Sequence, residues 1–150
     1  MDFARRHLMQ MTTLVGLMAC AGLLREAQAT AWNKSAFSAK TLDDVTKALG
    51  GHTPQKSEAI LLRAPDIAEN GALVSISIET ALKATELAIL VEKNPNTLAA
   101  IFTIPNGTEA FASTRIKMSE TSNVYALAKV DGRWLMSVKE IKVTIGACGG

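Results

Sequence analysis

The chain has 150 residues, of which 20% are charged and 48% hydrophobic, and its formal net charge is +2 at neutral pH. This size and composition predict one globular domain and exclude a disordered chain. The basic residues are scattered along the sequence. No electrostatic surface for nucleic acid is therefore expected, and a protein or small-molecule partner is favoured.

Residues 1–29 are predicted to be a twin-arginine-type signal peptide. Arg5 and Arg6 precede a moderately apolar run over residues 8–24, and the small-x-small pattern at 27–29 is typical of a cleavage site. The arginine pair and the polar interruptions of the run favour twin-arginine export to the periplasm. The length and interruptions of the run argue against a membrane anchor.

Cleavage after Ala29 would remove Cys20, one of the two cysteines, and leave Cys148 as the only thiol. A lipoprotein cleavage at Cys20 is disfavoured because the apolar sequence continues to Leu24. An unpaired thiol in an oxidising compartment is unusual and indicates a specific role.

Residues 30–57 are expected to form an N-terminal helical segment and a linker. Thr41 followed by two acidic residues is typical of a helix start, and Val45 and Leu49 lie at helical spacing before a pair of glycines. No period is apparent over residues 32–40, and residues 51–57 are expected to form a connecting loop.

Residues 58–145 are predicted to form an antiparallel β-sandwich. The hydrophobic period changes from 3.6 to 2, and turn sequences follow at short, regular intervals. In residues 73–80, Val74, Ile76 and Ile78 alternate with polar residues, which predicts one buried and one solvated face, and Leu87, Ile89 and Val91 repeat the pattern. The expected strands are 60–63, 73–80, 87–91, 98–104, 111–118, 124–130, 134–138 and 141–145.

The clearest of these elements is a hairpin around Asp131-Gly132, a dipeptide suited to a tight turn with positive φ angles. The number and spacing of the strands favour an all-β, immunoglobulin-like sandwich, although the paired cysteines of antibody domains are absent from the sequence. A small barrel remains the alternative, because spacing does not reveal strand order.

Residues 146–150 are predicted to be a flexible, glycine-rich arm that carries Cys148. Gly146, Ala147, Gly149 and Gly150 surround the thiol with small side chains, which gives the segment freedom and keeps it narrow. Five extended residues span roughly 17 Å. An enzyme cleft could therefore admit the arm.

The sequence does not predict an enzyme. After cleavage the only histidine is His52, about a hundred positions from Cys148 in an expected loop, so no local group would activate the thiol. No metal-ligand cluster, nucleophile elbow or phosphate-binding loop is recognisable, and no catalytic residue, metal or cofactor is expected. The reactivity of Cys148 would have to come from whichever enzyme receives it.

The sequence resembles the SoxY family of thiosulfate-oxidation carriers. The resemblance rests on segments 64–71, 92–95, 113–118 and 143–150 and extends through nearly all of the chain after the signal peptide. It implies an immunoglobulin-like sandwich, periplasmic location, and a heterodimer with a SoxZ-like subunit. In the family the cysteine of a terminal Gly-Gly-Cys-Gly-Gly binds the substrate, and this position corresponds to Cys148. Ala147 departs from the pattern, which has glycine at this position, and its Cβ disfavours positive φ angles.

The resemblance also implies a relay of sulfur intermediates on Cys148. A haem-containing enzyme would couple thiosulfate to the thiol as an S-thiosulfonate, a hydrolase would release sulfate, and a sulfane dehydrogenase would act on the sulfur that remains. Covalent attachment would present each intermediate at the effective concentration of a docked arm.

One alternative function stays open. The chain could be an exported structural or interaction domain whose cysteine only forms an intermolecular disulfide.

The basic stripe of Arg115 and Lys117 could be a solvated strand face, or it could face an acidic partner or an anionic adduct. Core or interface packing is expected for the side chains of Met118, Tyr125, Trp134 and Met136.

Overall fold

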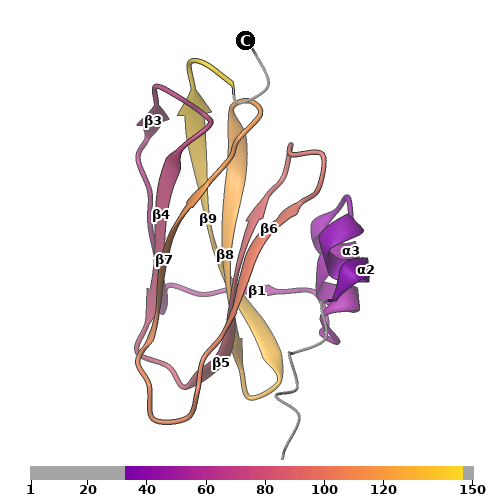
Figure 1. Cartoon of the computed structure of the whole chain (residues 1–150). Helices are drawn as coiled ribbons and strands as arrows, with labels where there is room; N and C mark the ends of the chain where they lie inside the picture. The colour runs from indigo at the N-terminus through magenta and orange to yellow at the C-terminus, as the bar shows by residue number, and fades with distance from the viewer. Residues whose placement is uncertain (1–32, 147–150) are drawn as a thin grey trace, which may run out of the picture. The chain divides into compact units, whose positions relative to one another are not determined.

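The computed structural model describes residues 33–146, so the predicted signal peptide lies outside the described part. Two sheets pack face to face as a sandwich (Figure 1). The larger sheet has the order β1 (Gln55–Lys56), β9 (Arg133–Val143), β8 (Ser122–Val130), β5 (Ala84–Val91) and β6 (Leu98–Thr103), and β3 (Ile67–Ala68) also pairs with β9. The smaller sheet has the order β2 (Ile60–Arg63), β4 (Val74–Thr80) and β7 (Ala110–Ile116). The predicted all-β sandwich is confirmed.

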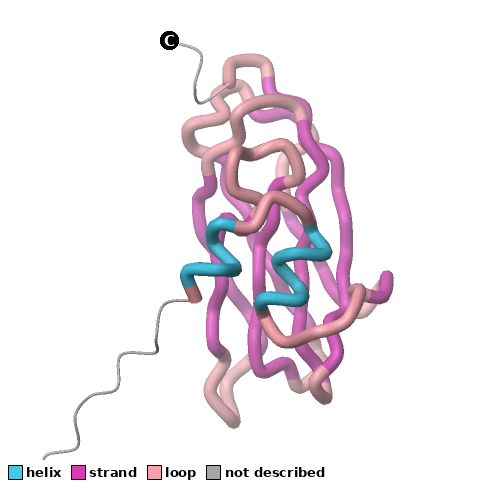
Figure 2. Tube along the Cα trace, turned by 90° about the vertical axis from the view of Figure 1, so that its right-hand side faces the viewer, coloured by secondary structure: helices cyan, strands magenta, loops and turns pink. Residues whose placement is uncertain are grey.

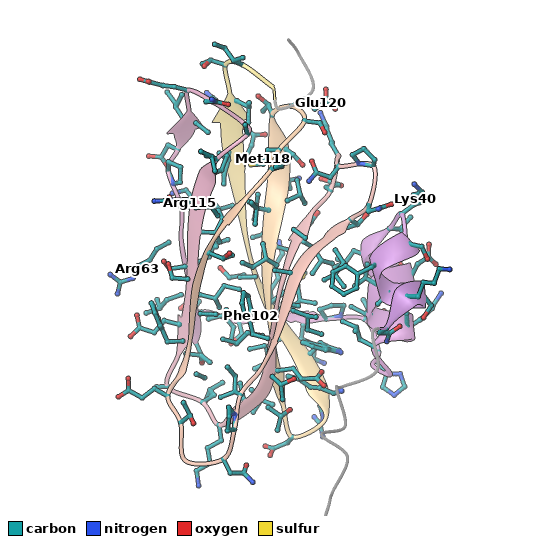
Figure 3. The ribbon with its side chains drawn as sticks, in the orientation of Figure 1. Lys40, Arg63, Phe102, Arg115, Met118 and Glu120 are labelled. Carbon is teal, nitrogen blue, oxygen red and sulfur yellow. The ribbon has the colours of Figure 1, made fainter. Side chains whose placement is uncertain are left out.

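The main core lies between the two sheets. Val74, Ile76 and Ile78 of β4 are buried there, as their alternation with polar residues predicted. Met118, just after β7, is fully buried in the same core. Phe102 of β6 is partly buried and packs against this core, and Figure 3 labels both residues. Because each inward side chain leaves water on folding, this alternation holds the two sheets together.

Two short helices precede the sheets. The predicted helix is α3 (Leu42–Ala48), and the Oγ1 atom of Thr41 caps it by accepting a hydrogen bond from the Asp44 amide over 3.1 Å. The helix α2 (Lys34–Ser38) was not predicted, and Asn33 caps it in the same way. With five residues it is too short to show a hydrophobic period, so its capping residue is its only local signal.

The helices cover the outer face of the larger sheet (Figure 2). Val45 of α3 belongs to a second apolar cluster together with Ala88, Leu90 and Trp134. The prediction that β5 has one wet face was therefore wrong, since Ala88 and Leu90 are as completely buried as their neighbours. Burial by a helix that is distant in sequence is a tertiary effect that strand periodicity does not report.

The predicted tight turn joins β8 to β9, with φ angles of 49° at Asp131 and 76° at Gly132. The two strands expected at 134–138 and 141–145 are one continuous strand, β9, of 11 residues. The two-residue strands β1 and β3 were not predicted, and residues 51–57 are not all loop as expected, because β1 lies within them. The strand β1 pairs in parallel with β9 near Leu135, and β3 pairs in parallel with β9 near Lys142.

Candidate functional site: the root of the C-terminal arm

Of the predicted arm, only Gly146 falls within the described residues, and Ala147, Cys148, Gly149 and Gly150 lie outside them. The described part of the site is therefore the place where the chain leaves the sandwich. We call residues 144–146 the arm root. It follows β9 directly, so the longest strand of the larger sheet leads to the predicted arm (Figure 1).

Hydrogen bonds hold the arm root on one side. The amide of Thr144 donates to the carbonyl of Ala68 over 3.1 Å, and its hydroxyl donates to the carbonyl of Glu69 over 2.9 Å. One residue later, the carbonyl of Ile145 accepts from the amide of Gly71 over 2.7 Å. These bonds extend the pairing of β3 with β9 and fix the backbone up to residue 145.

Gly146 is packed against the backbone of Ser119. A Cβ atom added at residue 146 would overlap the carbonyl oxygen of Ser119 and lie 3.2 Å from its carbonyl carbon. A side chain of any size would force one of the two backbones to move. Residue 146 is therefore glycine for a reason of space, in addition to the freedom that the sequence predicted for it.

The segment that contacts Gly146 is itself held in place. The amide of Met118 donates to the carbonyl of Gly71 over 2.7 Å, which joins this segment to the partner of the arm root. The side-chain amide of Asn94 donates to the carbonyl of Lys117 over 2.7 Å, and its oxygen accepts from the amide of Ser119 over 3.1 Å. Three segments far apart in sequence thus form one hydrogen-bonded structure around the arm root.

An ion pair secures the segment that leads into β3. The Nζ atom of Lys139 lies 2.8 Å from a carboxylate oxygen of Asp66 and also donates to the carbonyl of Ala64. The hydrogen bond and the positive charge of Lys139 lower the pKa of the Asp66 carboxyl below its ordinary value. Because Asp66 is exposed, this ion pair adds orientation rather than much stability.

Ile145 differs from its expected environment. Residues 141–145 were expected to form a strand, and Ile141 is indeed a fully buried strand residue, but Ile145 is 60% exposed. The reason is that β9 ends at Val143, so the chain no longer follows the pleat at residue 145.

Within residues 33–146, no group of histidine, cysteine and acidic side chains could hold a metal ion. His52 is exposed in the loop before β1. No helix in the described part of the chain is long and apolar enough to span a membrane.

Arg115 (Figure 3) and Lys117 are exposed and take part in no ion pair among the described residues, whereas the guanidinium of Arg63 pairs with Glu79 over 3.2 Å. Trp134 is buried and Tyr125 and Met136 are partly buried against the second apolar cluster, in agreement with the packing expected for them.

Comparison with known proteins identifies the family. The model of "Sulfur oxidation protein SoxY" matches residues 45–148, a range that includes Cys148. A solved structure of the sulfur carrier protein SoxY from Chlorobium limicola f thiosulfatophilum is similar, with 36% identity and a TM-score of 0.63 over 72% of this chain and 100% of that one.

A variant of the superoxide reductase (neelaredoxin) from Ignicoccus hospitalis shares the fold at 15% identity and a TM-score of 0.50, over 57% of this chain and 79% of that one. None of the curated proteins matches this chain. The family match covers the whole described sandwich, and the sulfur carrier SoxY structure is 36% identical and covered over its full length, so the chain belongs to the SoxY family.

Proposed function

We propose that this chain is a periplasmic carrier, not itself an enzyme, that binds thiosulfate-derived sulfur covalently on Cys148 and presents it to the enzymes of a thiosulfate-oxidation pathway. The observation that carries the proposal is the family match, which extends to Cys148 and covers the sandwich that precedes it. The similar structure from Chlorobium limicola is a sulfur carrier protein. The firmly held arm root supports the same role, because it supplies a fixed base for a short covalent tether.

The first proposed step couples thiosulfate to the thiol. The Cys148 thiol and thiosulfate form an S–S bond, which gives Cys148–S–S–SO₃⁻, and they release one proton and two electrons to a haem-containing enzyme. In the second step, water attacks the terminal sulfone. Sulfate and one proton leave, and a persulfide stays on Cys148 for a sulfane dehydrogenase.

Both steps need the carrier only to hold the sulfur and deliver it. A free anion must find each enzyme anew, whereas a tethered one arrives at a concentration set by the length of the arm. Catalytic groups are therefore expected on the enzymes that receive Cys148. The carrier contributes position.

Replacing the thiol tests this proposal. Protein purified from cells grown on thiosulfate is expected to carry sulfur-containing mass adducts confined to the peptide that holds Cys148, and Cys148→Ser is expected to abolish both the adducts and thiosulfate-dependent growth. In the alternative, an exported interaction domain whose cysteine only forms a disulfide, the thiol would stay bare after reduction and Cys148→Ser would not affect growth.

Export and assembly are part of the same proposal. We expect residues 1–29 to direct twin-arginine export, so that Arg5→Lys together with Arg6→Lys retains the precursor in the cytoplasm. We also expect a SoxZ-like subunit to co-purify as a heterodimer. Cell fractionation and mass measurement of the native complex test these two points separately.

A further inference from the structure

Three large apolar side chains are exposed around the arm root. Ile67 is 57% exposed, Leu73 is 66% exposed and Ile145 is 60% exposed. We call these three residues the apolar collar. Their segments are joined by backbone hydrogen bonds, since Ala68, next to Ile67, accepts from Thr144, and Gly71, close to Leu73, donates to Ile145.

Exposure of this kind needs a reason. Single exposed apolar residues are ordinary, but here three of them lie in segments that are hydrogen-bonded to one another at the point where the chain leaves the fold. The other exposed large hydrophobic side chains in the described part of the chain are less exposed, at 36–53%, so the collar holds the three most exposed ones; the others are Leu61, Leu82, Phe111 and Val138.

The length of chain between the arm root and the thiol limits what can cover the collar. Cys148 is only two residues beyond Gly146. Two peptide units span at most about 7.6 Å between Cα atoms, so the sulfur lies within roughly 10 Å of the Gly146 backbone. The length of roughly 17 Å applies to all five arm residues, whereas Cys148 is the third of them.

The held root makes a longer tether energetically costly. To free one more residue, the chain would have to leave the carbonyl of Ser119 and break the 2.7 Å hydrogen bond between Gly71 and Ile145. A protein that takes the sulfur into its active site must therefore bring its own surface to the arm root. The collar then lies at the contact.

We propose that the apolar collar is the surface on which an enzyme that processes Cys148 docks, against an apolar rim around the mouth of that enzyme's active site. This inference rests on the proposed function and names the contact that the function needs. Three side chains make a small contact, which suits a carrier that must leave each enzyme after one reaction.

A loaded carrier provides the probe for a test. Tetrathionate reacts with the Cys148 thiolate at one of its inner sulfurs, which forms Cys148–S–S–SO₃⁻ and releases thiosulfate, so that no further oxidant is needed. The rate of sulfate release by the sulfate-releasing hydrolase is then measured against the concentration of loaded carrier. The test variant is Ile67→Ser together with Leu73→Ser, which leaves the arm sequence intact.

The matched control is Leu61→Ser together with Phe111→Ser. These residues are 48% and 53% exposed, and both lie opposite Glu79 in the smaller sheet. Glu79 is near the end of β4 that is remote from Leu73. At about 3.3 Å per residue, this separation is roughly 20 Å.

We expect the collar variant to raise KM for the loaded carrier about tenfold with kcat unchanged, because docking contributes equally to the bound substrate and to the transition state. The control is expected to leave both constants unchanged. Equal KM values for the wild type and the collar variant, or equal effects of both variants, would overturn the inference. So would loss of the SoxZ-like subunit from the collar variant, since the collar would then belong to that interface.

The outcome is separable from that of the proposed function. If the hydrolase releases no sulfate from the loaded wild-type carrier, the proposed function fails. If it releases sulfate equally from the wild type and the collar variant, only the docking surface fails.

Discussion

The backbone amide of Ser119 donates to the side-chain oxygen of Asn94 over 3.1 Å, and through this bond the loop between β5 and β6 supports the segment that contacts the arm root. The amide group of Asn94 donates at the same time to the carbonyl of Lys117. One half-buried side chain thus satisfies two backbone groups in a segment that lies outside the strands.

Asn94→Ala is expected to destabilise the fold, because it removes both hydrogen bonds and leaves two backbone groups to find other partners. With each bond worth about 1 kcal/mol, the free energy of unfolding should fall by about 1–2 kcal/mol. Urea denaturation followed by circular dichroism measures this. The control Asn106→Ala, in the loop between β6 and β7, should leave the midpoint within error.

Gly146→Ala is expected to loosen the arm root without unfolding the sandwich. The new Cβ would overlap the carbonyl of Ser119, so residues 145 and 146 should move away and weaken the bond between Ile145 and the Gly71 amide. Hydrogen exchange of the Gly71 amide should then accelerate about tenfold or more. Gly149→Ala makes the same chemical change farther along the chain, and an equal acceleration there would refute the steric argument.

The ionisation of Tyr125 can be read directly, since it is the only tyrosine in the chain. Burial raises the pKa of its phenol above 10.0, and the negative charge of Glu92 adds to the increase. Titration by ultraviolet absorbance should therefore show ionisation above the ordinary range, and Glu92→Gln should lower the pKa. An unchanged pKa in this variant would exclude the charge of Glu92 as a cause.

Because the pKa of Tyr125 differs between the folded and unfolded states, the free energy of unfolding depends on pH. The folded state holds the proton of Tyr125 more tightly than the unfolded state does, so its contribution is complete below pH 10 and is lost as the pH rises through the higher folded pKa. Stability measured from pH 9 upward should fall less steeply in Glu92→Gln than in the wild type.

Gly51→Ala is expected to be the most damaging of these changes. A Cβ at residue 51 would overlap the indole ring of Trp134, which is only 2% exposed. Overpacking of this kind costs about 1–3 kcal/mol. Thermal unfolding measures the loss, and Thr53→Ala, an exposed change in the same loop, serves as the control. Equal midpoints for the two variants would show that the indole can move at little cost.

Local chemistry predicted part of this molecule well. The cap at Thr41 and the turn at Asp131-Gly132 were correct because a few neighbouring residues determine them. The burial of Val74, Ile76 and Ile78 was correct because these residues alternate strictly with polar ones. Each of these signals is contained in one short segment.

Features that depend on distant contacts were not predicted. The strands β1 and β3 exist only because β9 offers an edge to pair with, and two-residue strands have no period to detect. In the candidate site, the thiol and its glycines were recognised from composition and resemblance, but the contact of Gly146 with Ser119 joins residues far apart in sequence. No local pattern announces such an approach. The role of Cys148 stays a prediction that the experiments above test.

The parallel pairing of β3 with β9 has a mechanical consequence. When an enzyme withdraws while it still holds the thiol, as the proposed function implies, the component of its pull along β9 reaches the strand through the arm root. Such a load acts in shear on the β8 ladder on one side and on β3 on the other, so many hydrogen bonds share it at once. Peeling the strand away one bond at a time would need a sideways pull, and at the arm root β3 and the residues after it oppose that movement.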